Sequence, residues 1–379
     1  MSRHETGKPV DSWPVTPLRT SWDDLLEGID SPEAWAKKRK AIEQRFHDLM
    51  LNDAAPEPPC DFDAKVEREW DGGGFRIQYI SYQVEEDERA HAYVAIPDGP
   101  VPEGGFPAVV CLHGTTNWGA RRTLGLPPPP DDPHIGKSAP LNGKDYARQF
   151  VRRGYVTISP EHFCCAQRLP KGLRPFDTAA FYRKHPKWSA VGKYMHDSRI
   201  ACSVLSAFPE VNAGLLGVTG HSLGGHGSIW LAACDDRIRC AVPSCSARTI
   251  RENPEPLHWS RDYWYIYFPQ IREDFLAGRQ VICDFHEMMS LIAPRPMLER
   301  LALNDGHPEG QMHRVTLHLK LHELYRMLDA ESAHAFYVFG DGHSIPDQSQ
   351  ACAQSWMDRW LKHGGNGWGA SDIGYTPSE

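Results

Sequence analysis

From about residue 75 onward, short apolar runs alternate with longer segments that are typical of helices. Short apolar runs bounded by turn residues are typical of strands. Positions 75–83 and 90–96 alternate between apolar and polar residues, which predicts an antiparallel strand pair. Further strands are predicted at the apolar runs 107–112, 215–219, 296–303 and 335–339. Strands that alternate with helices in this way predict an α/β fold, with a mostly parallel central sheet flanked by helices.

The segment before the first predicted strand has a different pattern. Ser31 directly precedes Pro32, and a serine N-cap followed by proline at the first helical position predicts a helix that runs to about Leu51. A proline-rich linker follows this helix. The chain is therefore expected to consist of an N-terminal helical extension and linker, residues 1–70, and an α/β domain, residues 71–379.

The most informative motif is Gly-His-Ser-Leu-Gly at residues 220–224. It lies between the predicted strand 215–219 and a helix-like run of small residues at 225–234. A strand, a sharp turn with serine at its tip and then a helix form the context of the G-x-S-x-G nucleophile elbow. The flanking glycines let neighbouring backbone pass close to the turn without a Cβ clash. Ser222 is therefore the predicted nucleophile, with the N-terminus of the helix pointing at it.

A serine nucleophile needs a base, and the base needs an acid that orients it. In folds that carry this elbow, the chain order is serine, then aspartate or glutamate, then histidine. Asp305 follows the predicted strand 296–303, and His343 follows the predicted strand 335–339. Loops past the carboxyl ends of strands are where open α/β sheets build their sites. The sequence therefore predicts the catalytic residues Ser222, Asp305 and His343.

Two other carboxylates compete with Asp305 for the role of the acid. Asp341 is only two residues from His343, which is too local for its carboxylate to face the ring well. Glu309 lies four residues beyond Asp305 on the same predicted loop, and chain order does not separate these two. Asp305 is preferred because it follows the strand most directly.

The oxyanion that forms during acyl transfer needs two backbone N–H donors. One is predicted to be the N–H of Leu223, the residue after the nucleophile. The other is predicted to be the N–H of Thr115, in the loop after the strand 107–112. In that loop Gly114 lets the backbone approach the substrate oxygen. His113, Gly114 and His221 are accordingly expected to contact the substrate.

These segments resemble the α/β-hydrolase superfamily, in the branch of the dienelactone hydrolases and acetyl xylan esterase-like serine esterases. The resemblance covers about residues 75–363 and is carried by the runs 110–114, 153–161, 220–224, 236–242 and 292–296. It implies an α/β-hydrolase fold and ester hydrolysis. Dienelactone hydrolases use a cysteine nucleophile, so Ser222 implies the esterase side. Glucuronoyl esterases carry an arginine where this chain has Leu223, which makes a uronic acid ester a less favoured substrate.

Two insertions depart from a minimal hydrolase, near residues 115–142 and 246–287. The first follows the predicted oxyanion loop, so it is expected at the rim of the site or as a solvated loop. The second occupies the position where this fold often inserts a lid, and it is rich in aromatic residues. Such residues pack a core or line a pocket, and Trp264 is the candidate for contact with substrate.

Composition is that of a soluble enzyme. The formal net charge of −8 argues against nucleic acid as a partner, and no apolar run reaches the length of a membrane span. The first 15 residues have no apolar core, so no signal peptide is expected. The ten cysteines include no C-x-x-C pair and are expected to be reduced. We expect a cytoplasmic protein that acts on a small-molecule ester and has no membrane partner, and the sequence leaves open whether it forms a homo-oligomer.

No metal and no other cofactor is expected, although histidines gather in one region. His307, Glu309 and His313 lie close together, and His318 and His322 are spaced i, i+4 on a predicted helix. No H-E-x-x-H pattern is present, and the spacing matches no standard zinc site. These residues are therefore interpreted as part of a surface helix, with metal-assisted hydrolysis as the minor alternative.

The predicted function is that of a serine carboxylic ester hydrolase. It would act through an acyl-enzyme on a small ester, such as an acetyl ester of a sugar or another small alcohol, and the substrate rests on family analogy alone. A peptidase related to the prolyl oligopeptidases and a lactonase are alternatives within hydrolases. A non-catalytic binding protein on a hydrolase scaffold is the alternative of a different class.

Overall fold

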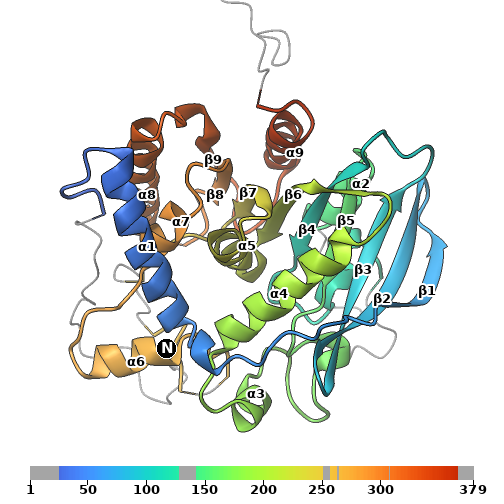
Figure 1. Cartoon of the computed structure of the whole chain (residues 1–379), viewed down its shortest axis with the longest axis horizontal. Coiled ribbons are helices and arrows are strands. Elements are labelled where there is room, and N and C mark those ends of the chain that lie inside the picture. The colour runs from blue at the N-terminus through green and yellow to red at the C-terminus, as the bar shows by residue number, and fades with distance from the viewer. Residues whose placement is uncertain (1–24, 128–141, 251–256, 263, 307, 366–379) are drawn as a thin grey trace, which may run out of the picture.

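The computed structural model describes residues 25–127, 142–250, 257–262, 264–306 and 308–365, without the side chains of residues 308–310. These residues form one nine-stranded sheet with the strand order β1-β2-β3-β5-β4-β6-β7-β8-β9 (Figure 1). The strands are β1 (Lys65–Asp71), β2 (Phe75–Glu85), β3 (Glu88–Pro97), β4 (Phe106–Leu112), β5 (Val156–Pro160), β6 (Val211–His221), β7 (Ile238–Ser244), β8 (Met297–Ala302) and β9 (His334–Phe339).

The sheet is mixed, but its larger part is parallel. β1, β2 and β3 form an antiparallel meander, and β3 is also antiparallel to β5. From β5 to β9 each neighbouring pair is parallel. The predicted antiparallel pair is confirmed by β2 and β3, in which Tyr79 lies opposite Tyr93. The expectation of a mostly parallel central sheet is also confirmed. The parallel pairing places the carboxyl ends of β4 to β9 at one edge of the sheet.

Helices cover both faces of the sheet. The α-helices are α1 (Pro32–Leu49), α2 (Tyr146–Val151), α3 (Ala179–Lys184), α4 (Ala190–Ser206), α5 (Leu223–Cys234), α6 (Pro269–Leu276), α7 (Phe285–Ser290), α8 (Pro308–Met327) and α9 (Asp347–Leu361). Short 3₁₀ segments include η4 (Gly119–Leu124). α4 and α5 pack on the face seen in Figure 1, and α2 and α9 pack on the opposite face. None of the helices in the described ranges has the length and apolar character that a membrane span requires.

Strand β4 shows why both faces are apolar. Val110 points into the core shared with α4 and α5, whereas Val109 and Cys111 point into the core shared with α2 and α9. A strand that is buried on both faces reads as a continuous apolar run, because successive side chains point to opposite faces. Cys202 and Cys240, like Cys111, are buried and free, as expected for core cysteines.

The N-terminal helix forms where its cap residues predict. Ser31 Oγ accepts a hydrogen bond from the N–H of Ala34 at 3.2 Å, and Pro32 occupies the first helical position. α1 packs against α7, where Arg45 forms an ion pair with Glu287. The extension therefore lies on the α/β domain, and the expected domain boundary at residue 70 falls near the end of β1.

The aromatic insertion at 246–287 packs mainly as core. Trp259, Tyr267 and Phe268 are each at most 5% exposed and surround the buried ring of Trp230 on α5. The sequence left open whether the aromatic residues pack a core or line a pocket, and these three side chains pack a core. In the other insertion, η4 is buried through Ala120 and Leu124, and residues 128–141 lie outside the described part of the chain.

Candidate active site

Ser222 occupies a sharp turn between the last residue of β6 and the first residue of α5. Its backbone has φ 60° and ψ −123°, a region that a residue with a side chain rarely adopts. Two hydrogen bonds hold this turn: the N–H of Ser222 donates to Ser244 O at 2.9 Å, and the N–H of His226 donates to Ser222 O at 3.0 Å. The strand, turn and helix predicted around Ser222 are therefore present, with the side chain at the tip of the turn.

Glycines permit the close packing around this turn. A Cβ on Gly224 would lie 1.9 Å from Leu112 O, so only glycine lets the start of α5 pass the end of β4. A Cβ on Gly114 would lie 2.9 Å from His221 O, so the loop after β4 also rests on the turn. The glycines thus bring the predicted oxyanion loop against the predicted nucleophile, although the two are more than 100 residues apart in sequence.

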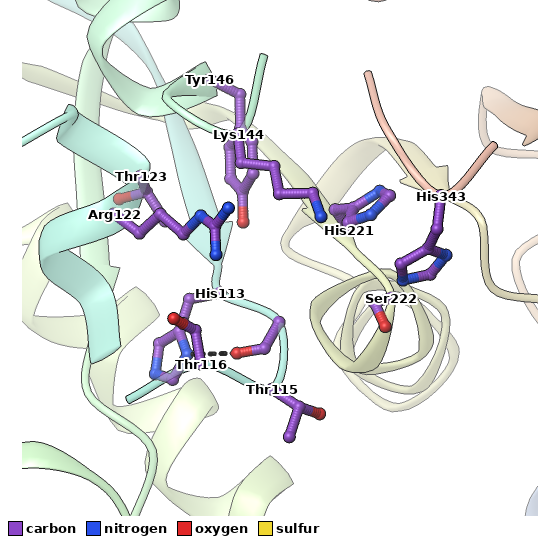
Figure 2. Close-up of a pocket in the computed structure, with 11 residues that line it drawn as sticks. His113, Thr115, Thr116, Arg122, Thr123, Lys144, Tyr146, His221, Ser222 and His343 are labelled. Atoms are coloured by element: carbon purple, nitrogen blue, oxygen red, sulfur yellow. Dashed lines mark hydrogen bonds between the residues drawn. The ribbon is translucent and has the colours of Figure 1, made fainter. Parts of the chain in front are cut away.

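Asp305 and His343 meet across two neighbouring loops. Asp305 follows β8 and His343 follows β9, and these two strands are paired in parallel. His343 Nδ1 lies 2.8 Å from Asp305 Oδ2, a hydrogen-bond distance. Burial alone would raise the pKa of Asp305, but the bond to His343 and the charges of Arg314 and Arg248 hold that pKa below its ordinary value. Figure 2 shows the His343 ring beside the hydroxyl of Ser222.

The competing carboxylates lie differently. Asp341 is exposed, and its backbone carbonyl, not its carboxylate, is the group that bonds the Asp305 loop, through the N–H of Asn304. Glu309 lies in the first turn of α8, and its side chain is outside the described part of the structure. Among the described side chains, Asp305 is the carboxylate that contacts His343.

A cavity of about 80 Å³ opens between Ser222 and the loop after β4. Three of the residues predicted to contact substrate, His113, Gly114 and His221, line this cavity together with Ser222 and His343. Its remaining described lining residues are Thr115, Thr116, Arg122, Thr123, Lys144 and Tyr146 (Figure 2). Trp264 is not among the described lining residues.

Trp264 is held by the segment that contains Arg174 and Pro175. Its Nε1 donates a hydrogen bond to Pro175 O at 2.9 Å, and the guanidinium of Arg174 lies 4.2 Å from the centre of its ring. The structure therefore gathers the other predicted site residues but does not bring Trp264 to the cavity.

Arg122 and Lys144 are lining residues that the sequence did not single out. Arg122 lies on η4, within the first insertion, and Lys144 lies on the loop that follows the insertion and precedes α2. Each is an ordinary cation in a polar segment, and no motif marks either one. Only a signal of spatial proximity could have found them, because 21 positions separate them along the chain.

The two residues predicted to supply the oxyanion donors lie on either side of the cavity's serine turn. Leu223 is the first residue of α5, and Thr115 is in the loop after β4, which lines the cavity. Thr115 Oγ1 lies 3.5 Å from Tyr265 Oη, so the aromatic insertion contacts this loop. The N-terminus of α5 also points its backbone dipole at the cavity side of Ser222, which favours negative charge there.

A buried chain of polar groups supports the loop after β4. His113 Nδ1 donates to Gly114 O at 2.8 Å, and His113 Nε2 accepts from the N–H of His162 at 3.2 Å. His162 Nε2 in turn lies 3.0 Å from Tyr267 Oη. Burial lowers the pKa of His113 to about 4, so the ring is neutral at physiological pH. A neutral His113 can hold this geometry without placing a charge beside the nucleophile.

Two of the histidines considered as metal ligands, His318 and His322, have other contacts in the fold, whereas His307 lies outside the described residues. The interpretation of a surface helix is wrong for His318, which is fully buried. Its Nε2 bonds Glu299 Oε2 at 2.8 Å, and its ring stacks on His334. His322 is exposed and pairs with Glu331. His318 is buried because α8 presents it to β8 and β9, a contact that i, i+4 spacing alone does not reveal.

A different group of side chains could hold a metal ion. His221, Cys245 and His343 each offer a ligand atom, and these atoms lie within 4.8 Å of one another. Burial raises the pKa of the Cys245 thiol to about 11, which disfavours the thiolate that binds metals. The group also includes His343, so a metal bound there would take the ring away from Ser222.

Comparisons with known proteins bear on the fold. No protein-family profile matches the chain. "Putative hydrolase YtaP" of Bacillus subtilis (strain 168) is 27% identical over 235 residues, which cover 60% of this chain and 70% of that protein. A glucuronoyl esterase from Solibacter usitatus superposes with a TM-score of 0.66 at 15% identity, over 92% of this chain and 99% of the other. An acetyl xylan esterase from Paenibacillus sp. R4 superposes with a TM-score of 0.54 at 17% identity, over 84% and 93%.

These likenesses establish the fold. The chain has the α/β fold of the esterase structures it superposes on, with a mostly parallel sheet flanked by helices and an N-terminal helix. Its relatives are hydrolases and esterases of the α/β-hydrolase type, so the resemblance inferred from the motifs is confirmed.

Proposed function

We propose that this protein is a serine carboxylic ester hydrolase that works through an acyl-enzyme. The observation that carries the proposal is the strained turn at Ser222 beside the hydrogen-bonded pair of His343 and Asp305. A half-buried serine on such a turn has no structural need for its unfavourable backbone, and strain of this kind concentrates at functional sites. A nucleophile, a base and an orienting acid are then provided by three separate strand ends.

The first step is attack on the ester carbonyl. His343 Nε2 takes the proton of the Ser222 hydroxyl as Oγ bonds the carbonyl carbon, and the carbonyl π electrons move to the oxygen. Asp305 holds the Nδ1–H of the ring, which keeps Nε2 as the acceptor and stabilises the imidazolium that forms. His343 then gives its proton to the departing alcohol. Water repeats the sequence on the acyl-enzyme and releases the acid.

The oxyanion is bound by the N–H groups of Leu223 and Thr115 in this proposal. Each preorganised donor of this type contributes on the order of 3 kcal/mol to the transition state. The support is positional, since Leu223 opens α5 and Thr115 lies on the loop that Gly114 brings against the elbow.

The cavity favours a compact substrate group. A volume of about 80 Å³ beside Ser222 suits a short acyl or alkyl group better than a long chain. We propose a small ester, such as an acetyl ester of a sugar or another small alcohol, as the substrate. An acetyl xylan esterase among the structural neighbours supports the same class.

A labelling experiment tests the reaction class. The purified protein would be incubated with a serine-directed alkyl phosphonate and analysed by intact mass and peptide mapping, with Ser222→Ala as the matched control. We expect one adduct per chain on Ser222 and none in the variant. Short p-nitrophenyl esters, a peptide amide and a lactone would then be compared as substrates. Absence of both labelling and ester turnover would contradict the proposal and favour a binding protein, whereas preferred turnover of the amide or lactone would favour a peptidase or lactonase.

A further inference from the structure

A second cavity, of about 290 Å³, lies on the antiparallel part of the sheet formed by β1, β2 and β3. It is named the meander groove, and its described lining residues are Arg68, Trp70, Tyr79, Tyr93, Arg121 and Gln167. None of these residues lines the cavity beside Ser222. The proposed reaction therefore gives the meander groove no role.

Strand register places the aromatic lining residues on one face of the sheet. Arg68 on β1 lies opposite Tyr79 on β2, and Tyr79 lies opposite Tyr93 on β3. Residues that are directly opposite point to the same face, so these three side chains form one row across the strands. The ring centres of Tyr79 and Tyr93 are 4.7 Å apart, and Trp70 contacts Tyr93 edge-on at 6.3 Å. The groove thus has an aromatic floor.

Segment η4 lies beside this floor. Arg121 donates from Nη1 to Tyr93 Oη at 3.2 Å and from Nε to Pro127 O at 2.8 Å. These two bonds hold the guanidinium at the groove. The next two residues, Arg122 and Thr123, line the cavity beside Ser222. η4 therefore lies between the two cavities, with Arg121 on the side of the meander groove.

The lining carries positive charge without a carboxylate to match it. Arg68 and Arg121 are the charged residues among the described lining residues. Arg68 is exposed and has neither a hydrogen bond nor an ion pair with any residue in the described ranges. Its neighbour Glu67 is engaged elsewhere, because Glu67 Oε1 accepts a hydrogen bond from Ser81 Oγ at 2.5 Å. The charge of Arg68 is therefore available to a ligand.

The electrostatics of the floor show that both arginines act on it. Burial is the main cause that raises the pKa of the Tyr79 hydroxyl, and the charge of Glu161 adds to it, whereas Arg121 and Arg68 lower it. Glu161 does not line the groove; it is buried, and its Oε2 accepts from the N–H of Gln167 at 3.3 Å. Burial raises the pKa of Glu161 to about 7, so this carboxyl is only partly ionised at neutral pH and offsets the two cations incompletely.

An adjoining cavity that shares Gln167 has a different balance of charge. There Arg168 forms ion pairs with Glu88 and with Asp197, the latter at 2.6 Å, and Lys193 pairs with Asp197 at 3.0 Å. The protein itself neutralises the cations of that cavity. In the meander groove no such pairs form among the described residues, which favours an anionic ligand.

We propose that the meander groove binds a small aromatic carboxylate. The rings of Trp70, Tyr79 and Tyr93 supply apolar contact for the aromatic part of the ligand. The planar guanidinium groups of Arg68 and Arg121 match the geometry of a carboxylate. An uncharged sugar could pack on the same rings, but it would leave both charges unmatched. This site is separate from Ser222, and the inference goes beyond the proposed function.

The ligand class is tested by calorimetric titration of the wild-type protein with phenylacetate. Two matched compounds serve as controls: 2-phenylethanol lacks the charge, and acetate lacks the ring. We expect saturable binding of phenylacetate with a Kd at least about tenfold lower than that of either control, the size of one charge-assisted hydrogen bond. Equal binding of 2-phenylethanol would contradict recognition of the charge, and equal binding of acetate would contradict recognition of the ring. Absence of saturable binding would overturn the site.

Variants place the ligand in the groove. Arg68→Met should raise the Kd of phenylacetate at least about tenfold, Arg68→Lys should raise it less, and Trp70→Leu should raise it as well. Arg239→Met is the matched control, because Arg239 is also an exposed arginine on a strand, β7, but lies outside the groove. An unchanged Kd in Arg68→Met, or an equal rise in Arg239→Met, would overturn the site.

Ester hydrolysis separates this inference from the proposed function. Arg68→Met should leave kcat/KM for a neutral short-chain ester unchanged, because Arg68 has no part in the proposed reaction, and circular dichroism would verify the fold. If phenylacetate competed with the ester and Arg68→Met did not relieve the competition, the ligand would lie in the cavity beside Ser222 and the groove would be excluded. Absence of ester hydrolysis in the wild-type protein would instead count against the proposed function and leave the binding test intact.

Discussion

The change Asp305→Asn is expected to abolish most of the activity while leaving the fold intact. In the native structure Asp305 Oδ2 lies 2.8 Å from His343 Nδ1, so the carboxylate accepts the Nδ1–H and leaves Nε2 free to accept the serine proton. An asparagine amide can instead donate to Nδ1, which moves the ring proton to Nε2. The ring then has the wrong tautomer for a base, and a loss in kcat on the order of 10⁴ is expected.

The expected loss of activity in Asp305→Asn is much larger than the expected loss of folding stability. A loss of 10⁴ corresponds to about 5.5 kcal/mol in the activation free energy. The Asp305 side chain is 22% exposed and that of His343 is 42% exposed, so loss of their bond should change the free energy of unfolding by only about 1 kcal/mol. The activity should therefore fall far more than the stability measured by denaturant unfolding.

The assay is steady-state hydrolysis of a neutral short-chain ester, with circular dichroism to verify folding. Asp341→Asn and Glu309→Gln are the controls, and each is expected to change kcat less than about tenfold, as substitutions outside the triad do. If Glu309→Gln gave the large loss and Asp305→Asn the small one, with both variants folded, the acid would be Glu309. The reasoning from the contact between Asp305 and His343 would then be refuted.

Three further predictions concern other parts of the molecule. Ser222→Ala and His343→Ala should each cost about as much kcat as the double variant, because triad residues act as a unit, and additive losses would contradict this. Burial raises the pKa of Glu161 from 4.5 to about 7 despite the neighbouring Gln167 N–H and Arg168. The folded state thus holds this proton longer than the unfolded state, so stability should fall by up to about 3 kcal/mol between pH 4.5 and 7, and Glu161→Gln should remove that decline in urea unfolding. EDTA should leave ester hydrolysis unchanged, because the proposed reaction uses no metal, and a loss of activity that added Zn²⁺ restores would contradict it in favour of metal-assisted hydrolysis.

The local pattern predicted those features whose physical causes lie within a few residues. The strand pair β2 and β3 follows from alternation of apolar and polar positions, and the start of α1 follows from Ser31 and Pro32. The turn at Ser222 follows from its flanking glycines between an apolar strand and a small-residue helix. In each case the constraint is steric or concerns hydrogen bonds along a short stretch of chain, so the sequence contains it.

Residues that act through distant contacts were harder to identify. His318 has the spacing of an exposed helix position, yet it is buried against Glu299, because the packing of α8 on the sheet decides which side of the helix faces inward. Trp264 is aromatic and lies in an insertion suited to a lid, but its indole N–H bonds Pro175 O, and it is not among the described residues that line the cavity. The type of side chain alone predicts neither the burial of His318 nor the hydrogen bond of Trp264.

The sequence by itself determined six of the strands, the start of α1 and the identity of the candidate nucleophile, because these depend on periodicity, on local capping and on the steric freedom of nearby glycines. Only the tertiary structure decided that Asp305 meets His343 and that Arg122 and Lys144 share one cavity. The reason is physical: each of these pairs joins segments far apart in sequence. Their separation is set by the pairing of β8 with β9 and by the contact of the Asn142 loop with Ile345, not by any local preference of the residues themselves.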